Sequence, residues 1–364
     1  MSDPESLATV DVLTKVVVPA FFSDRNLDCL TICRAVNLSL ERGNCYASCL
    51  AYVMLGRIAG ARFGNYQAAV RFAQLGFELV EARGLKRFQA SIYVYFAVWI
   101  APWMKHVGFA RDLLFQAFEG ANKIGDLTHA AYARVNLNSG LLFAGDPLSE
   151  VQREFEVGLR FAEKARYGLI FDTMTCQLAP VRTLRGFTLK FGSFDSREFD
   201  EGSVERQLAS NPAFAITECW YWVRKLQARY LAGNYEEAMK ASSEAQRLLW
   251  TSIAFFEEAE CHFYTALSRA ASCDSVRADE RVQHLEALAA HHRRLEIWAG
   301  NCPENFENRA ALVGAEIARI ESRDLDAMRL YERAIHSSRV NGFVNNEALA
   351  YERASDFYRS HGFD

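Results

Sequence analysis

A six-residue turn occurs twice in this sequence, and its spacing constrains the fold more than any other feature. Residues 64–69 read Gly-Asn-Tyr-Gln-Ala-Ala, and residues 233–238 read Gly-Asn-Tyr-Glu-Glu-Ala. In both copies an apolar helical pattern precedes the glycine and a mixed one follows the tyrosine. Further turn signals recur at intervals of about 43 residues, which is the period that stacked helix pairs produce. The turns fall at Gly64, His106, Gly145, Gly192, Gly233, Ser275 and Asp324.

The hydrophobic pattern within each period predicts two helices. Cys219, Trp222, Val223, Leu226 and Tyr230 recur at the spacing of one helix face. Alternation typical of strands is missing from this partition. We therefore predict an all-α fold, an α-α superhelix or solenoid of about seven helical hairpins. The expected hairpins cover residues 25–60, 66–102, 107–143, 147–190, 213–248, 253–298 and 303–340.

Small residues mark where helices end and where they approach each other. Ala69 and Ala238 lie one turn into the second helix of a pair, where a larger side chain would separate the two helices. Glycine favours the left-handed conformation that closes many helices. We expect such helix ends at Gly43, Gly84, Gly125, Gly168, Gly300 and Gly342.

The array is expected to form one domain over residues 1–364, with two irregularities. Pro180 should kink or break its helix. Residues 187–211 lose helical periodicity and mix phenylalanine with acidic residues, which indicates an irregular insertion. Such a segment is either a functional loop or a solvated connector that plugs its aromatic side chains into the stack. Residues 344–364 resemble a truncated C-terminal hairpin.

Charge and hydropathy argue against two classes of partner. The formal net charge is −4, from 41 basic and 45 acidic residues, and the basic residues are scattered. A protein that binds nucleic acid through phosphate contacts would cluster them. The longest uncharged apolar stretch, residues 91–104, is too short to cross a bilayer. With no cationic leader at the N-terminus, we expect a cytoplasmic protein that contacts neither nucleic acid nor membrane.

Cysteine and histidine provide the candidate metal ligands. Cys29 and Cys33 share one helix face, and Cys45 and Cys49 share the next. Four thiolates bind zinc, but antiparallel pairing of the two helices would leave the two pairs about two turns apart. We interpret all four as core cysteines. His284 and His291 lie two turns apart, too far to share a metal, so a solvated helix face containing His284, His291 and His292 is expected.

The sequence contains no local catalytic motif. It has neither the Gly-x-x-x-x-Gly-Lys-Ser/Thr loop of nucleotide-binding proteins nor kinase signatures. Two aromatic clusters, Trp99 with Trp103 and Trp220-Tyr221-Trp222, either pack between hairpins or line a groove. We therefore assign no catalytic, cofactor-binding or metal-binding residue and expect no cofactor. The sequence does not identify the ligand-binding residues.

The sequence resembles the TPR superfamily, and more specifically the helical-repeat region of large bacterial signalling proteins. Those proteins join a kinase-like module, a STAND/AAA-type ATPase, the repeat region, and a GAF plus histidine-kinase output. Because the nucleotide-binding and kinase modules are missing, the chain resembles a fragment of such a protein. The resembling stretches are residues 65–69 through 78–81, 145–148, 218–222, 246–250, 302–306, 327–335 and 341–343.

The resemblance implies a non-catalytic interaction or sensor-relay module. Its concave face would bind a protein segment or a small ligand and regulate an attached ATPase or kinase. Its partners would be flanking domains, another protein or a small effector. Two alternatives remain open at this point. One is an (α/α) toroid enzyme of glycosidase or lyase type that uses inner carboxylates, and the other is a truncated, non-functional remnant.

Overall fold

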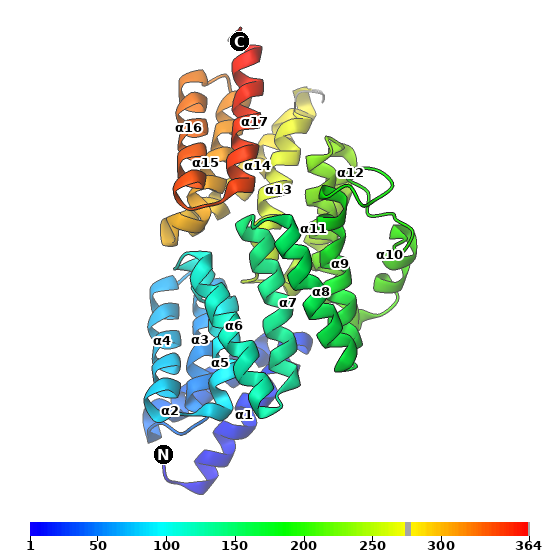
Figure 1. Cartoon of the computed structure of the whole chain (residues 1–364). Coiled ribbons are helices and arrows are strands. Elements are labelled where there is room, and N and C mark those ends of the chain that lie inside the picture. The colour runs from blue at the N-terminus through cyan, green and yellow to red at the C-terminus, as the bar shows by residue number, and fades with distance from the viewer. Residues whose placement is uncertain (274–277, 363–364) are drawn as a thin grey trace. The chain divides into compact units, whose positions relative to one another are not determined.

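All regular structure in this protein is helical. The computed structural model describes residues 1–273 and 278–362, and within these ranges it contains seventeen α-helices, three short 3₁₀ helices and no β-strand (Figure 1). Each helix packs chiefly against its neighbours in the chain. The predicted all-α helical-repeat fold is therefore confirmed.

Contacts divide the chain into two compact units, with a boundary inside α7. The first unit comprises Met1–Met104 and Gly108–Asn136. Within it, α1 to α5 pack in chain order, and α3 contacts both α1 and α5. Its elements are α1 (Pro4–Ser23), α2 (Arg25–Arg42), α3 (Ser48–Ala61), α4 (Tyr66–Arg83), α5 (Lys86–Trp99), η1 (Ala101–Trp103), α6 (Val107–Ile124) and the start of α7 (Leu127–Ala144).

The second unit comprises Lys105–Val107 and the chain from Leu137 onward. Its helices form two rows: α9, α11, α13, α15 and α17 each contact the next in an inner row, while α8, α12, α14 and α16 flank it. These helices are α8 (Leu148–Lys164), α9 (Gly168–Leu184), α10 (Glu201–Ala209), η2 (Pro212–Phe214), α11 (Ala215–Leu231), α12 (Tyr235–Leu248), η3 (Leu249–Thr251), α13 (Phe256–Ser272), α14 (Ala278–Asn301), α15 (Pro303–Ile320), α16 (Asp324–Val340) and α17 (Val344–Ser360).

The hairpins predicted from the repeat match pairs of observed helices. The pairs α2–α3, α4–α5, α6–α7, α8–α9, α11–α12, α13–α14 and α15–α16 lie within a few residues of the seven expected ranges. Helix α1 precedes them and has no counterpart in the prediction. The expected turns at Gly64, Gly145 and Gly233 have positive φ. The turn expected at Ser275 lies outside the described residues.

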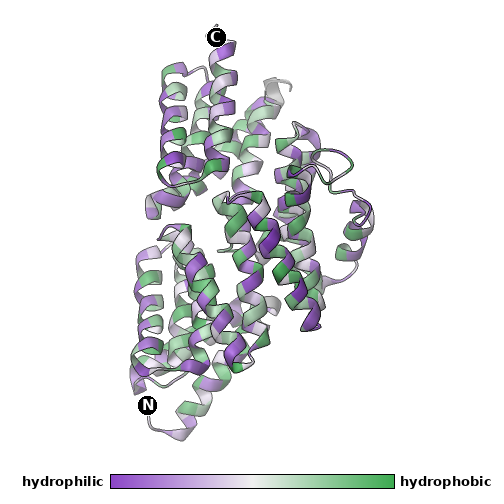
Figure 2. Cartoon of the chain, viewed as in Figure 1, coloured by the Kyte–Doolittle hydropathy of each residue, from purple (hydrophilic) through white to green (hydrophobic). Residues whose placement is uncertain are grey.

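Outer helices bury one stripe, as an amphipathic helix should. In α8, Val151, Phe155, Gly158 and Ala162 are buried and the remaining residues are partly or fully exposed. Figure 2 shows hydrophilic and hydrophobic residues side by side around single helices. Inner helices differ, because neighbours cover them on several sides. In α13 nearly every residue from Phe256 to Ala270 is buried, charged ones included.

Two expected helix ends were wrong, and the break expected at Pro180 does not occur. Gly168 begins α9 instead of ending α8, and the left-handed residue at that turn is Arg166. Gly300 lies inside the last turn of α14, which continues to Asn301. Pro180 does not break α9, which runs through it to Leu184. A proline removes one backbone donor, but most residues of α9 around it are buried, and this packing keeps the helix continuous.

The expected irregular insertion, residues 187–211, is only partly irregular. Residues 187–200 lack regular structure, but residues 201–209 form α10 and residues 212–214 form η2. The Asp200 side chain accepts a hydrogen bond from the amide of Ser203 and caps α10, and Asn211 caps η2 in the same way. The sequence does not reveal α10 because the helix is short and buries only Glu201 and Leu208, too few residues to show a helical period.

Small residues allow α3 and α4 to pack closely, as expected from Ala69. A Cβ atom added at Gly76 would lie 2.5 Å from the carbonyl oxygen of Cys49 and 2.8 Å from a methyl group of Val53. One added at Gly56 would lie 2.7 Å from the carbonyl oxygen of Ala69. Backbone atoms cannot move aside cheaply, so these glycines set the distance between the two helices.

We predict that Gly76→Ala lowers the free energy of unfolding by about 1–3 kcal/mol, because the added methyl overlaps backbone atoms. Gly120→Ala in α6 is the matched control, since no atom lies within 4 Å of its added Cβ. It should raise the free energy of unfolding by about 0.5–1 kcal/mol through the helix preference of alanine. Urea denaturation of both variants measures this, and equal effects would contradict the close approach of α3 and α4.

Candidate functional site

The insertion is anchored by aromatic side chains. Phe194 and Phe199 are buried, and their rings lie edge to face at 6.4 Å. Phe194 also meets the ring of Tyr221 on α11 at 5.8 Å. They belong to one apolar cluster with Cys176, Ala179, Leu208 and Ala228. The expectation that aromatic side chains plug this segment into the stack is confirmed for these two residues, whereas Phe191 is 51% exposed.

The backbone of the insertion also docks onto the inner row. The amide of Gly192 donates to the hydroxyl of Thr183 at 2.9 Å, and its carbonyl accepts from Arg229 at 2.8 Å. Gly192 has φ +83°, and an added Cβ would lie 2.4 Å from Cβ of Ala232. Only glycine fits this position, because both its backbone conformation and its distance from α11 exclude a side chain.

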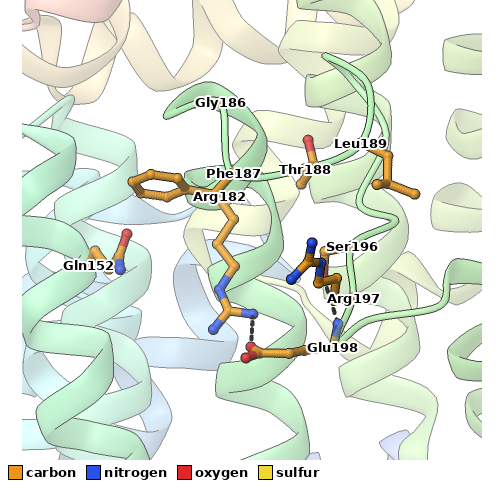
Figure 3. A pocket seen from close by; sticks show the side chains of 9 residues that line it. All are labelled: Gln152, Arg182, Gly186, Phe187, Thr188, Leu189, Ser196, Arg197 and Glu198. Carbon is orange, nitrogen blue, oxygen red and sulfur yellow. Dashed lines mark hydrogen bonds and ion pairs between the residues drawn. The ribbon is translucent and has the colours of Figure 1, made fainter.

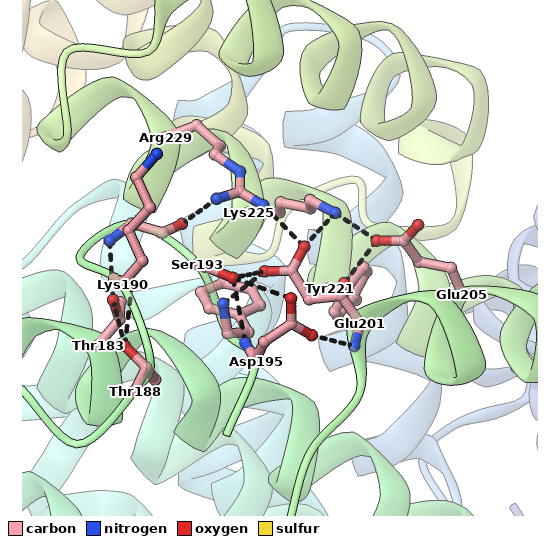
Figure 4. Close-up of polar contacts among 12 residues, drawn as sticks. Thr183, Thr188, Lys190, Ser193, Asp195, Glu201, Glu205, Tyr221, Lys225 and Arg229 are labelled. Carbon is pink, nitrogen blue, oxygen red and sulfur yellow. Dashed lines mark hydrogen bonds and ion pairs between the residues drawn. The ribbon is translucent and has the colours of Figure 1, made fainter. Parts of the chain in front are cut away.

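Glu201, the first residue of α10, holds the insertion through its buried carboxylate (Figure 4). Lys225 and Arg229 of α11 each donate to it at 2.7 Å. The Ser193 hydroxyl donates to it at 2.9 Å, and so does the amide of Phe194. One buried carboxylate thus joins the irregular segment, α10 and α11. A buried charge is stable only when it is paired and hydrogen-bonded in this way.

Burial alone would raise the pKa of the Glu201 carboxyl. The hydrogen bonds from Lys225 and Phe194 and the positive charges of Lys225 and Arg229 outweigh burial, so the pKa lies below its usual value. Beside it, Glu205 accepts from the Tyr221 hydroxyl at 2.7 Å and also pairs with Lys225. Burial, followed by the hydrogen bond to Glu205, raises the pKa of Tyr221 well above its ordinary value. The lowered pKa keeps Glu201 ionised and the raised pKa keeps Tyr221 neutral, which suits a structural role.

The insertion encloses an open pocket against α8 and α9 (Figure 3). Its volume is about 470 Å³, within the range of small-ligand sites. The Arg182 guanidinium donates to Glu198 at 3.2 Å across the pocket. We call this the insertion pocket. It is lined by Gln152, Arg182, Gly186, Phe187, Thr188, Leu189, Ser196, Arg197 and Glu198.

Large apolar side chains are exposed at the rim of the insertion pocket. Leu189 is 78% exposed and Phe187 is 55% exposed. The guanidinium of Arg185 lies 4.8 Å from the centre of the Phe187 ring and donates to Gln152. Exposed apolar side chains beside polar and charged ones are typical of binding surfaces. This pocket and its rim form the candidate functional site.

The aromatic clusters noted in the sequence have mainly packing roles. Trp220 is buried, and its indole donates to Ser252 at 3.0 Å. Tyr221 is buried against the insertion, whereas Trp222 is only partly buried and lies under the ammonium of Lys225. In the first unit, Trp103 is buried. Trp99 stacks on Tyr95 at 4.9 Å and packs beside Arg57.

The interpretation of four core cysteines holds for Cys45 and Cys49 and was wrong for Cys29 and Cys33, which lie on a less covered face of α2. All nine are free; seven are buried, and Cys29 and Cys33 are partly exposed. The Sγ atom of Cys29 lies 3.0 Å from the Arg62 guanidinium. Burial raises the pKa of Cys49 to about 12. Over residues 1–273 and 278–362, no three His, Cys, Asp or Glu side chains are placed to hold a metal ion.

The histidine prediction was wrong for His291. Its side chain is buried, and its Nδ1 lies 2.8 Å from Nδ1 of His262 on α13. The reason is its place on α14, in line with the buried residues Leu288, Leu295 and Trp298. That stripe packs α14 onto α13. His292 contacts the carbonyl of Ala310 at 3.0 Å.

Comparison with known proteins adds no family. No protein-family model matches the sequence, and no curated protein matches it. The resemblance to the repeat region of bacterial signalling proteins therefore stays a prediction. Among the described residues, every helix is too short or too polar to cross a lipid bilayer.

We predict that Glu201→Gln lowers the free energy of unfolding by about 2–4 kcal/mol, because it leaves Lys225 buried with a weaker partner. Limited proteolysis should cut the insertion faster in this variant. Glu236→Gln removes an exposed carboxylate that pairs with Lys240 and should leave the urea midpoint unchanged. A wild-type midpoint and cleavage rate for Glu201→Gln would contradict the anchoring role.

We predict that stability falls as pH drops from about 6.5 toward 4. Burial and nearby positive charge lower the pKa of His262 to about 3 and that of His291 to about 4. The unfolded chain binds protons on both histidines below their ordinary pKa, whereas the native chain does not, so acid favours unfolding. Full stability is reached above that ordinary pKa.

Urea midpoints measured across this pH range test the histidine pair. The double variant His262→Gln/His291→Gln should show a much flatter pH dependence than the wild type. His336→Gln, at an exposed position of α16, should retain the wild-type slope. An unchanged slope in the double variant would assign the acid sensitivity to other groups.

Proposed function

We propose that this chain is a non-catalytic interaction module that binds a segment of a protein partner. In this proposal it is a cytoplasmic, regulatory helical-repeat region that relays binding to flanking domains of a signal-transduction ATPase or kinase. The observation that carries the proposal is the insertion. It is firmly anchored, yet it exposes Phe187 and Leu189 at a pocket and Phe191 farther along the segment. Ordered loops with exposed apolar groups on a rigid scaffold are typical binding elements.

Contacts within the inner row of the second unit support the insertion, and not the concave face, as the binding surface. The ring of Phe143, near the end of α7, lies 4.4 Å from Phe256 and 5.9 Å from Phe306. The hydroxyl of Ser139 donates to the buried carboxylate of Glu257. Residues of α7 thus cover part of α13 and α15, and this part of the inner row is not open to a guest.

The inner carboxylates do not favour the alternative of a toroid enzyme. Glu257 and Glu260 are buried, and each is paired with a buried arginine at 3.0 Å. A glycosidase needs one carboxyl that holds a proton and a second that meets substrate or water. Carboxylates fixed by guanidinium partners suit neither role. A truncated, non-functional remnant is a further alternative, and the following test addresses it.

Panning of a phage-displayed random peptide library against the purified chain tests the proposal. We expect a family of related peptides that bind with dissociation constants below about 100 μM, as weak modular interactions do. Titration calorimetry of the synthetic peptides measures the affinity. Enrichment of no peptide family above an unrelated helical protein would contradict the interaction module and favour the remnant.

A further inference from the structure

Residues 182–198, which form the insertion pocket side of this region, are basic in a chain that is acidic overall, whereas the acidic residues of the insertion gather in its α10 half. Between residues 182 and 198, two acidic side chains, Asp195 and Glu198, face an excess of basic ones, whereas the whole chain carries a formal charge of −4. The basic side chains are Arg182, Arg185, Lys190 and Arg197. A local positive field beside exposed apolar groups attracts anionic partners and repels cationic ones.

The cations around the insertion pocket are not equally available. Arg182 is paired with Glu198, and Arg185 donates to Gln152. Arg197 also lines the pocket, and within the described part of the chain its guanidinium has no hydrogen-bond or ion-pair partner. In Figure 3 its side chain points into the pocket, between Arg182 and Ser196. The pocket therefore offers one free guanidinium.

One free guanidinium matches one carboxylate. A carboxylate accepts two parallel hydrogen bonds from arginine, the strongest neutralising contact available to a monoanion. A phosphate dianion would need more positive charge and would lie near the exposed carboxylate of Glu198. The charge balance of the insertion pocket thus favours aspartate or glutamate over phosphate.

The apolar surface extends the site beyond the pocket. Leu189 and Phe187 line the pocket, while Phe191 lies farther along the same segment and is also exposed. A single small acid in the pocket would leave this surface uncovered. A polypeptide places an apolar side chain next to its acidic one and covers both features.

From these observations we infer that the insertion pocket binds a peptide segment in which an acidic residue neighbours a large apolar one. The acidic side chain pairs with Arg197, and the apolar side chain packs on Phe187 and Leu189. This inference rests on the proposed interaction function and names the chemistry of its partner.

Fluorescence anisotropy with a defined probe tests the inference. The probe is a short fluorescein-labelled peptide that alternates glutamate with leucine and phenylalanine, and the comparison peptide has glutamine in place of glutamate. The full chain should bind the acidic probe at least about tenfold more tightly, because a charge-assisted pair is lost in the comparison. Arg197→Glu should weaken binding of the acidic probe by about tenfold or more, and Leu189→Ser by severalfold.

Matched substitutions on α16 are the controls. Arg329→Glu and Leu325→Ser alter another exposed arginine and another exposed leucine, and both variants should bind the probe as the wild type does. All four side chains are solvent-exposed, so the variants should fold, and circular dichroism checks that they do.

Three outcomes would overturn the inference. The first is equal binding of the acidic and glutamine peptides, and the second is wild-type affinity in Arg197→Glu. The third is tighter binding of a phosphoserine peptide that also depends on Arg197, which would identify a phosphate site. If library peptides bind but ignore Arg197 and Leu189, the inference fails while the interaction module stands; if none binds, the module itself fails.

Discussion

Buried ion pairs between successive inner helices are the interaction on which the second unit depends. Arg224 of α11 pairs with Glu257 of α13, and Glu260 of α13 pairs with Arg309 of α15. Removing one partner of such a pair leaves an uncompensated buried charge, at a cost of about 3–5 kcal/mol. Sliding one hairpin past the next would separate both pairs at once. The pairs therefore fix the register of hairpins whose apolar contacts alone are not directional.

Arg309 shows how completely such a charge is accommodated. Burial lowers the pKa of its guanidinium and the charge of Glu260 raises it. Its guanidinium also donates to the carbonyls of Asn305 and Phe143 and lies 3.8 Å from the centre of the Phe143 ring. The first unit uses the same device, with Arg57 of α3 paired to Asp28 of α2.

The sequence predicted what depends on period and failed where contacts are made in space. Turn spacing and helical stripes predicted the seven hairpins, because both features depend on residues that are close in the sequence. The inner row was not predictable from them: α13 reads as an amphipathic helix with an acidic first turn, and only arginines on other helices, α11, α14 and α15, explain why its acids are buried. His291 was misplaced for the same reason. Its partner, His262, lies on another helix.

The insertion follows the same principle with a different outcome. Glu201 is a buried acid, like Glu257 and Glu260, and it joins the insertion to the inner row through ion pairs with Lys225 and Arg229. The sequence showed the mixture of aromatic and acidic residues, but not which of them anchor the segment. The anchoring residues are Phe194, Phe199 and Glu201.

Because buried residues anchor the insertion, its exposed side chains are not needed to hold it in place. Because the fold holds the segment through Phe194, Gly192 and Glu201, the side chains of Leu189 and Arg197 do nothing for stability that the structure reveals. Exposed apolar groups lower solubility when nothing covers them. The buried side chains of the loop are hydrogen-bonded or packed, whereas Leu189 and Arg197 on its exposed side are not. This asymmetry is expected of a recognition element, because the loop is already ordered before the partner binds.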